Sequence, residues 1–231
     1  MFEDYTQTLV LQEVPANQPV STFQPTPFQA PASTYQPKPE YKKKPFFEKK
    51  EDLSEGVLYK PFVVTGNKEA PVAVLQTIHR LVQELEHFGY TLRTGGLEGP
   101  DDVAEKASKT VELYLPWKPF NDKESKFYWN SKQSKDIARM FHPTYDALKP
   151  AIQAFLAKNV RMVIGEKLRS PAMFIIGWSE DGCEHAREVT GKTGNIGHVI
   201  SVASAMKIPV FNLSKPDAEQ RLKHFLELNN G

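Results

Sequence analysis

The chain has 231 residues, and 29 Lys and Arg residues nearly balance 28 Asp and Glu residues, giving a formal net charge of +1 at pH 7. This balance excludes a general electrostatic attraction to nucleic acid or to a membrane and leaves only local patches for such contacts. The single cysteine, Cys183, excludes an internal disulfide framework and suits a reducing compartment.

The sequence contains no recognisable membrane or export segment. No run approaches the ~18 apolar residues of a membrane span. The N-terminal Met-Phe-Glu-Asp has neither the basic nor the apolar region of a secretory signal. We therefore expect a cytoplasmic protein without a membrane partner.

Residues 1–55 differ in composition from the rest of the chain. They hold 8 of the 18 prolines and no glycine, whereas all 13 glycines and all three tryptophans follow from Gly56 onward. Too little apolar surface is present in the first segment to offset the entropy of ordering it. We therefore predict a disordered, proline-rich arm over residues 1–55 and one folded domain over residues 56–231.

The arm carries a loose repeat of aromatic residues and prolines, at residues 23–28 and again at 35–41. Proline spacing of this kind favours extended polyproline II, on which aromatic side chains can dock into a protein partner. A solvated spacer is the equally weighted alternative.

The domain alternates strands and helices. In chain order, the pattern predicts a strand at 59–65, a helix at 71–88, a strand at 90–93, a helix at 100–109 and a strand at 111–115. An irregular aromatic segment at 116–132 follows, then a helix at 145–168 with a break near Asn159, a strand at 172–178, a helix at 195–206, a strand at 208–213 and a helix at 218–228. This order predicts an α/β, Rossmann-like, doubly wound and mainly parallel sheet.

Glycine-rich turns follow the predicted strands. In a parallel sheet, ligands bind beyond the carboxyl ends of the strands, and a helix start there can hold a phosphate. The expected ligand-binding residues after the first two strands are Gly66, Asn67, Thr94, Gly95, Gly96, Gly99 and Asp101. We expect Gly95 to supply a positive φ for the turn and Gly96 to give a ligand access to bare backbone.

A second turn raises the expectation of a ligand site. The predicted ligand-binding residues that follow the fourth strand are Trp178, Ser179, Gly191, Lys192, Thr193, Gly194 and Asn195. Their amides and side chains can donate many hydrogen bonds to an anion, and Lys192 is expected to contact a phosphate. Two such turns at one edge of the sheet form a cradle for a nucleotide or a nucleotide-derived ligand.

Residues 186–193 also satisfy a relaxed phosphate-loop pattern, with alanine in the first glycine position. A true phosphate loop follows a buried strand directly, whereas a polar stretch, 179–184, intervenes here. An ATPase is therefore disfavoured. Cys183 and His185 are two ligands and do not make a metal site, so we predict no metal and no catalytic residue.

Other polar residues have simpler interpretations. His198 is expected to be satisfied by its own neighbours, and Lys158, Arg161, Lys167 and Arg169 to form a solvated helix face. The aromatic residues of 116–132 lie among lysines, so the segment either stacks on nucleic-acid bases or caps the core under a long loop.

The turns at 65–67, 94–101 and 191–194, the segment 112–117, the strand before Gly182 and the strand before Leu213 resemble the SLOG superfamily. This group includes the DNA-processing DprA proteins and the lonely-guy phosphoribohydrolases, and the chain looks most like phage-type DprA-like members. The resemblance covers about residues 58–215. It implies a Rossmann-like nucleotide-binding domain, located in the host cytoplasm if a phage encodes it.

The chain departs from the phosphoribohydrolase pattern. The helix start at 195–199, which corresponds to the catalytic glutamate, has no carboxylate, so nucleotide cleavage is disfavoured. The leading hypothesis is therefore a non-catalytic binding module for a nucleotide or a nucleotide-derived small molecule. Alternatives are a DprA-like protein that binds single-stranded DNA, and an interaction protein tethered by its arm; a homo-oligomer also stays open.

Overall fold

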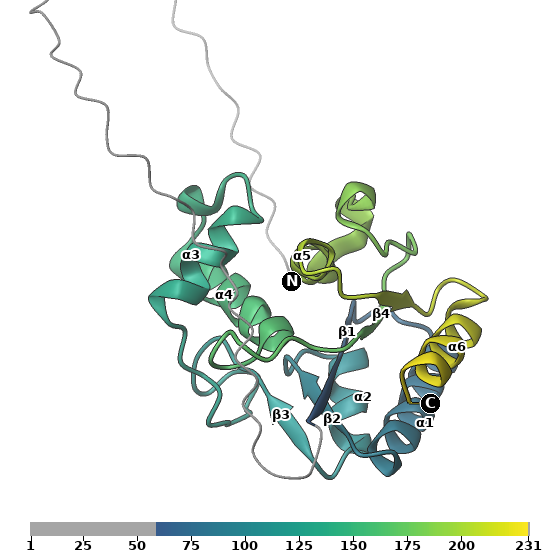
Figure 1. Ribbon diagram of the computed structural model, residues 1–231. Coiled ribbons are helices and arrows are strands. Elements are labelled where there is room, and N and C mark those ends of the chain that lie inside the picture. The colour runs from purple at the N-terminus through teal and green to yellow at the C-terminus, as the bar shows by residue number, and fades with distance from the viewer. Residues whose placement is uncertain (1–58, 231) are drawn as a thin grey trace, which may run out of the picture. The chain divides into compact units, whose positions relative to one another are not determined.

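The computed structural model describes residues 59–230. The predicted arm, residues 1–55, and the predicted start of the domain at residue 56 lie outside these described residues. Within them, five strands form one sheet: β1 (Lys60–Gly66), β2 (Tyr90–Thr94), β3 (Val111–Leu113), β4 (Ile175–Trp178) and β5 (Val210–Asn212). Their order is β3-β2-β1-β4-β5, and every neighbouring pair is parallel. The predicted fold class is confirmed (Figure 1).

Helices connect the strands. They are α1 (Val72–His87), α2 (Pro100–Ala107), α3 (Lys132–Met140), α4 (Pro150–Ile164), α5 (Gly197–Ala205) and α6 (Ala218–Asn230). Three short 3-10 helices are η1 (Tyr145–Ala147), η2 (Ala186–Glu188) and η3 (Gly191–Ile196). Among the described residues, no helix combines the length and the apolar character of a membrane span.

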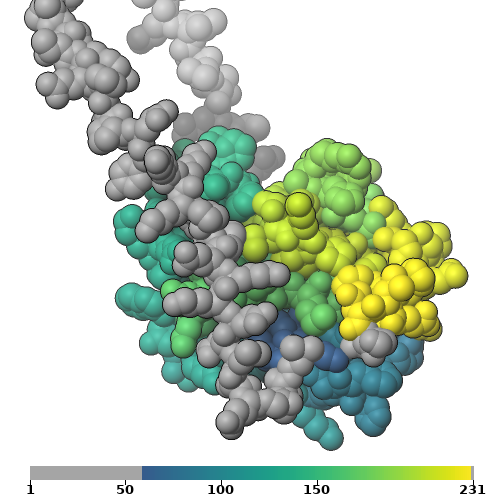
Figure 2. Space-filling model, viewed as in Figure 1, coloured from purple at the N-terminus to yellow at the C-terminus, as the bar shows by residue number. Residues whose placement is uncertain are grey.

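Successive residues of β1 face opposite sides of the sheet, as the pleat of a strand requires. Phe62 and Val64 pack in a core with α1, α2 and α6, whereas Val63 packs in a second core with α3, α4 and α5. The sheet is therefore covered on both faces. At the surface α6 lies beside α1 (Figure 2), and Arg80 Nη2 pairs with Glu219 Oε2 at 2.7 Å.

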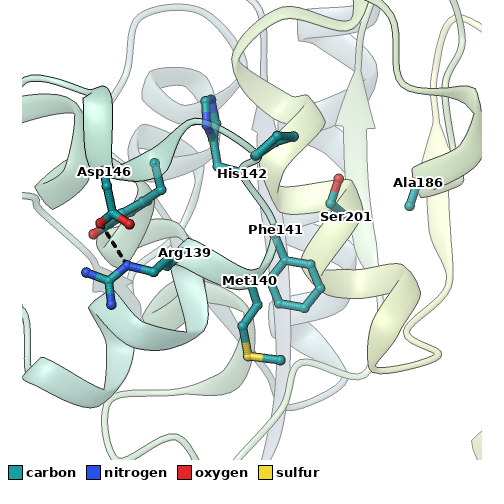
Figure 3. A pocket seen from close by; sticks show the side chains of 9 residues that line it. Arg139, Met140, Phe141, His142, Asp146, Ala186 and Ser201 are labelled. Atoms are coloured by element: carbon teal, nitrogen blue, oxygen red, sulfur yellow. Dashed lines mark hydrogen bonds and ion pairs between the residues drawn. The ribbon is translucent and has the colours of Figure 1, made fainter. Parts of the chain in front are cut away.

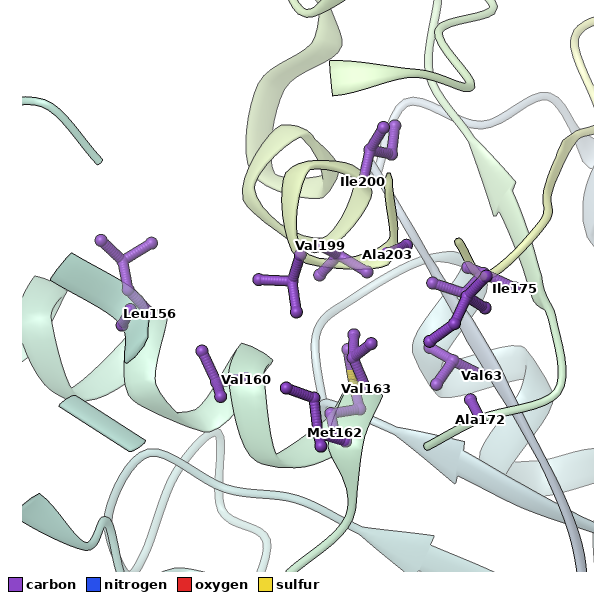
Figure 4. Close-up of a cluster of buried hydrophobic side chains, with 14 of the residues drawn as sticks. Val63, Leu156, Val160, Met162, Val163, Ala172, Ile175, Val199, Ile200 and Ala203 are labelled. Carbon is purple, nitrogen blue, oxygen red and sulfur yellow. The ribbon is translucent and has the colours of Figure 1, made fainter. Parts of the chain in front are cut away.

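The second core lies between α4, α5 and the sheet. Figure 4 shows Val160 and Val163 of α4 facing Val199 of α5, with Val63 and Ile175 of the sheet beside them. Because the sheet, α3 and α5 all pack on α4, every residue from Leu156 to Ile164 is buried. This burial places α4 directly behind the carboxyl ends of the strands.

The burial of α4 corrects two predictions from the sequence. The predicted break near Asn159 is wrong, because α4 continues to Ile164 and ends at Gly165, whose φ is +90°. The predicted solvated face is wrong for Lys158 and Arg161, which are 0% and 1% exposed. Arg161 is accommodated by Glu166 Oε2 at 2.6 Å and by Leu115 O at 3.0 Å.

One helix that was not predicted and one helix start also differ from the predictions. α3 was not predicted, because few of its residues are apolar; its signal is Ser131, whose side chain accepts a bond from Ser134 N and caps the helix start. α5 begins at Gly197 rather than at 195, because Gly194 has the non-helical angles φ 63° and ψ −143°.

Candidate functional site

The strand order places β2 and β3 on one side of β1, and β4 and β5 on the other. The carboxyl ends of β1 and β4 therefore form the topological switch point of the sheet, where ligands usually bind in this type of fold. A hollow of about 540 Å³ lies there, which we call the β1–β4 hollow. Six of the predicted ligand-binding residues line it: Asn67, Trp178, Gly191, Lys192, Gly194 and Asn195.

Two acidic residues that the sequence analysis missed complete the lining. They are Glu69, just after β1, and Glu180, just after β4. Lys192 Nζ lies 3.8 Å from Glu180 Oε1, and both side chains are exposed, at 72% and 70%. Their one sequence signal is their position within a few residues of a strand end.

Asn67 holds the η3 turn against the end of β1. Its Nδ2 donates to Thr193 O at 3.1 Å, and its Oδ1 accepts from Asn195 N at 3.1 Å. Gly194 has a φ of +63°, and an added Cβ would stand 2.7 Å from Asn67 Oδ1. The closeness of the turn to Asn67 therefore requires glycine at this position.

Asp181 organises the loop between β4 and η3. Its carboxylate accepts from the hydroxyls of Thr193 at 2.6 Å, Ser179 at 2.8 Å and Thr190 at 2.8 Å. Although partial burial acts to raise it, these hydroxyl bonds lower the pKa of Asp181 to about 2. Two predicted ligand-binding residues, Ser179 and Thr193, are fully buried in this network and do not line the hollow.

The turn after β2, residues 94–101, is tied to the end of β1 by Asp101. The carboxylate accepts from Gly95 N at 2.9 Å and from Gly66 N at 3.3 Å, and it is 0% exposed. Burial raises the pKa of Asp101, against the opposing effects of Lys158 and of the hydrogen-bond donors. We call residues 94–101 the first turn, and residues 191–195 the second turn.

One role expected for the two glycines of the first turn is wrong, because the positive φ is not at Gly95. Gly96, not Gly95, has the positive φ, at +70°, and an added Cβ would stand 2.9 Å from Leu115 Cδ2. Gly95 instead allows a close approach, because an added Cβ would collide with Lys158 Nζ and stand 3.0 Å from Asp101 Oδ1. Farther along the turn, Gly99 has a φ of +87° and packs on the backbone of Lys68.

The predicted residues of the first turn do not line the β1–β4 hollow. The two turns still approach one another through the segment after β1. An added Cβ on Gly99 would meet Lys68 Cα at 2.9 Å, and one on Gly194 would meet Asn67. Gly66 and Thr94, at the ends of β1 and β2, are both buried.

The stretch 179–190 separates β4 from η3, so the lysine-containing turn does not follow a buried strand directly, as a phosphate loop does. Among residues 59–230, no three His, Cys, Asp or Glu side chains group as metal ligands. Cys183 is buried, and its Sγ donates to His185 O at 3.3 Å.

A second hollow, of about 340 Å³, lies between the end of α3 and α5 (Figure 3). Phe141 and His142 of the segment after α3 face Ser201 of α5, and Arg139 pairs with Asp146 at 2.9 Å beside them. None of the predicted ligand-binding residues lines this hollow.

His198 has only part of the environment that was expected. Its Nε2 lies 3.4 Å from Ala138 O, but its Nδ1 is buried without a hydrogen-bond partner. Burial lowers the pKa of His198 to about 4. It does not line the β1–β4 hollow.

The aromatic segment 116–132 divides into two groups. Phe127 packs against the core and stacks on Tyr114, with ring centroids 5.0 Å apart. Trp117, Tyr128 and Trp129 are exposed, at 41%, 42% and 71%. The segment therefore caps the core with one group and presents the other to solvent.

Comparisons with known proteins give one finding of likeness. No family model matches the chain, and no curated protein matches it. Among solved structures, the chain is similar to DNA processing protein A from Helicobacter pylori, whose structure is described as showing a unique single-stranded DNA binding mode. The likeness has 19% sequence identity and a TM-score of 0.41, and covers 71% of this chain and 72% of that chain.

Proposed function

We propose that the domain binds a nucleotide or a nucleotide-derived small molecule in the β1–β4 hollow. The observation that carries the proposal is the position of the hollow at the topological switch point of the sheet. The second turn and Trp178 border the hollow there. Its volume of about 540 Å³ lies within the range of small-molecule sites.

The chemistry of the lining suits a ligand with both hydroxyl and anionic groups. Glu69 and Glu180 are acceptors for sugar hydroxyls, a role that acidic side chains after strands fill in dinucleotide-binding folds. Lys192 offers a cation, and Trp178, which is 8% exposed, borders the hollow with the residues of the second turn. No reacting group is assigned, because the helix start at 195–199 contains no carboxylate.

The proposal is tested by a substitution whose larger side chain fills the β1–β4 hollow without disturbing the fold. Gly191 borders the hollow, has no positive φ, and an added Cβ there would meet nothing within 4 Å. Nucleoside monophosphates are titrated calorimetrically into the wild type, Gly191→Ala and Gly191→Trp. We expect Gly191→Ala to bind normally and Gly191→Trp to bind at least about tenfold more weakly while it stays folded, because one buried ring can occlude a ligand subsite.

Two outcomes contradict the proposal. If Gly191→Trp binds as tightly as the wild type, the ligand does not occupy the β1–β4 hollow. If no nucleoside monophosphate binds the wild type, the ligand class is wrong.

Single-stranded DNA is the second candidate, and the exposed aromatic residues favour it. Trp117, Tyr128 and Trp129 are interleaved with lysines, including Lys126, whose Nζ lies 5.0 Å from the ring centroid of Phe127. Proteins that bind single strands combine stacking aromatic rings with cations along a groove. This surface is separate from the β1–β4 hollow.

Oligothymidylate binding, followed by tryptophan fluorescence at several salt concentrations, tests this candidate. We expect the logarithm of the affinity to fall linearly with the logarithm of salt concentration, and Trp129→Ala to cost about 1–3 kcal/mol. The matched control is Phe88→Ala, which removes an aromatic ring that is 67% exposed at the end of α1. Equal losses for both variants would exclude stacking on Trp129.

A further inference from the structure

The amides of the second turn are largely engaged within the protein. The amide of Thr193 donates to Thr190 O at 3.2 Å, and that of Lys192 donates to Thr190 Oγ1 at 3.1 Å. The amide of Asn195 donates to Asn67 Oδ1 at 3.1 Å. A phosphate-binding turn instead points its free amides at the ligand. These three amides are therefore not available to an anion.

The hydroxyl groups at the second turn are engaged as well. Thr193 and Thr190 both donate to Asp181 Oδ2, at 2.6 Å and 2.8 Å. Against the effect of its partial burial, the hydroxyl bonds hold the pKa of Asp181 at about 2, so this group is a carboxylate at neutral pH. Asp181 thus places a negative charge beside the turn, and this charge repels an anionic ligand group.

The charged side chains that line the β1–β4 hollow are two carboxylates, Glu69 and Glu180, and one ammonium, Lys192, so their net charge is −1. Lys192 Nζ lies 3.8 Å from Glu180 Oε1, which offsets its charge before a ligand arrives. Glu69 and Glu180 are exposed, and their oxygens are open to a ligand. A carboxylate only accepts hydrogen bonds. The hollow therefore favours the part of a ligand that carries donors and no negative charge.

In a nucleotide, the ribose carries such donors. Its 2′- and 3′-hydroxyl groups are adjacent and can both donate, and hydrogen bonds to an ionised acceptor are among the strong ones. Acidic side chains beyond strand ends bind the ribose 2′-hydroxyl in dinucleotide-binding folds. The phosphate, by contrast, is an anion that the carboxylates repel.

We propose that the β1–β4 hollow selects the ribonucleoside part of its ligand, with the ribose hydroxyls on Glu69 and Glu180, and leaves any phosphate in solvent. The inference rests on the proposed function and adds to it which end of the ligand enters. Because deoxyribose lacks the 2′-hydroxyl, single-stranded DNA is a poor ligand for the hollow. The two candidate ligands of the domain are thus distinguished by their sugars.

The experiment compares four probes by calorimetry at two salt concentrations, with a chelator present to remove divalent cations. The probes are adenosine, 2′-deoxyadenosine, adenosine monophosphate and adenosine triphosphate, and the guanine series is measured in parallel. Glu69→Gln and Glu180→Gln each remove one charge from the hollow and keep the size of the side chain. Glu227→Gln is the matched control, because Glu227 lies on α6, is 77% exposed and does not line the hollow.

We expect the wild type to bind a ribonucleoside about tenfold more tightly than its 2′-deoxy form, the value of one hydrogen bond to a charged acceptor. The monophosphate should bind no more tightly than the nucleoside. The triphosphate should bind about three- to tenfold more weakly at low salt, and this difference should shrink at high salt because salt screens the repulsion. Glu69→Gln and Glu180→Gln should each reduce both preferences, and Glu227→Gln should change neither.

The outcomes separate this inference from the proposed function. If affinity rises from nucleoside to monophosphate to triphosphate, the phosphate enters the site, so the inference is overturned and the proposed function stands. Equal binding of the ribose and deoxyribose forms, or preferences that are unchanged in both glutamine variants, also overturns the inference alone. If neither nucleosides nor nucleotides bind, the proposed function fails and the inference fails with it.

Discussion

The two glycine turns at the carboxyl edge of the sheet use the same residue type for different purposes. In the first turn, Gly95 and Gly96 are buried, and Gly95 packs against the Asp101 carboxylate and the Lys158 ammonium. In the second turn, Gly191 and Gly194 are exposed and border an open hollow. The first turn is a sealed polar interior, and the second is a solvent-facing rim.

This difference determines what each turn can reveal about a ligand. A polar group in a buried turn must find a partner within the structure, so an unpartnered one is informative. An exposed turn leaves its donors to water, so its hydrogen-bonding capacity by itself says nothing about an occupant. The structure is therefore most informative at the buried Lys158, whose Nζ has no hydrogen-bond partner, whereas the sequence pattern pointed to Lys192.

The largest effect on stability is expected from replacing Asp101, which tests whether the first turn depends on buried polar contacts as the second turn does not. Asp101→Ala removes the acceptor for two backbone amides and the charge opposite Lys158. We expect it to lower the free energy of unfolding by about 3–5 kcal/mol, because the buried charge of Lys158 then loses the opposite charge that compensates it. Urea unfolding measures the loss. Asp102→Ala, which breaks surface ion pairs with Lys106 and Lys123, should cost about 1 kcal/mol or less, and equal losses would refute the sealed arrangement.

The second effect is a rise of stability with pH that depends on Lys158. Its pKa is about 8 in the folded protein and about 10.4 in an unfolded chain. Between these values the unfolded chain binds more protons than the folded one, so the free energy of unfolding rises with pH, by about 3 kcal/mol in all. Lys158→Met should remove this rise in urea unfolding between pH 8 and pH 10. A rise that persists in the variant would assign it to other groups.

The sequence predicted the sheet but not the interior of α4. Apolar runs that end at glycine, such as the one before Gly66, predict buried strands wherever they occur, because burial and the tight turn are both local properties. Lys158 and Arg161 were interpreted as exposed because charged residues in helices usually are. Their burial depends on groups far away in the chain, including Leu115 O for Arg161 and Asp101 for Lys158. Such pairings become visible only once the fold brings these residues together.

The candidate site was predicted in part for the same reason. Asn67 directly follows β1, Trp178 ends β4 and the second turn starts a helix, and a sequence pattern can indicate each of these positions beside the hollow. Glu69 and Glu180 were missed because an exposed carboxylate has no distinguishing pattern. The positions of Gly95 and Gly96 could not be told apart, since φ in a turn depends on how the following segment packs, here on Leu115.

The third prediction exchanges the roles of the two glycines in the sealed turn. Gly96→Ala forces alanine to a φ of +70° and toward Leu115, so we expect it to cost about 2 kcal/mol of stability. An added Cβ at Gly95 meets the flexible end of the Lys158 side chain and needs no positive φ, so we expect Gly95→Ala to cost only about 1 kcal/mol. Thermal unfolding of both variants measures the two losses. A larger loss for Gly95→Ala than for Gly96→Ala would show that the contact with Lys158, and not the positive φ, limits substitution in this turn.

The smallest effect on ligand binding is expected from replacing Lys192, in the second turn. Its side chain is 72% exposed and lies 3.8 Å from Glu180 Oε1, so its charge is screened by water and by its neighbour. We expect Lys192→Ala to weaken nucleoside monophosphate binding only about two- to fivefold at low salt, and less at high salt, as for an exposed ion pair. Calorimetry at two salt concentrations measures this, with the exposed Lys207→Ala as control. A loss greater than about tenfold, insensitive to salt, would mean that the second turn closes over its ligand and becomes a buried turn like the first. The contrast between the two turns would then hold for the free protein alone.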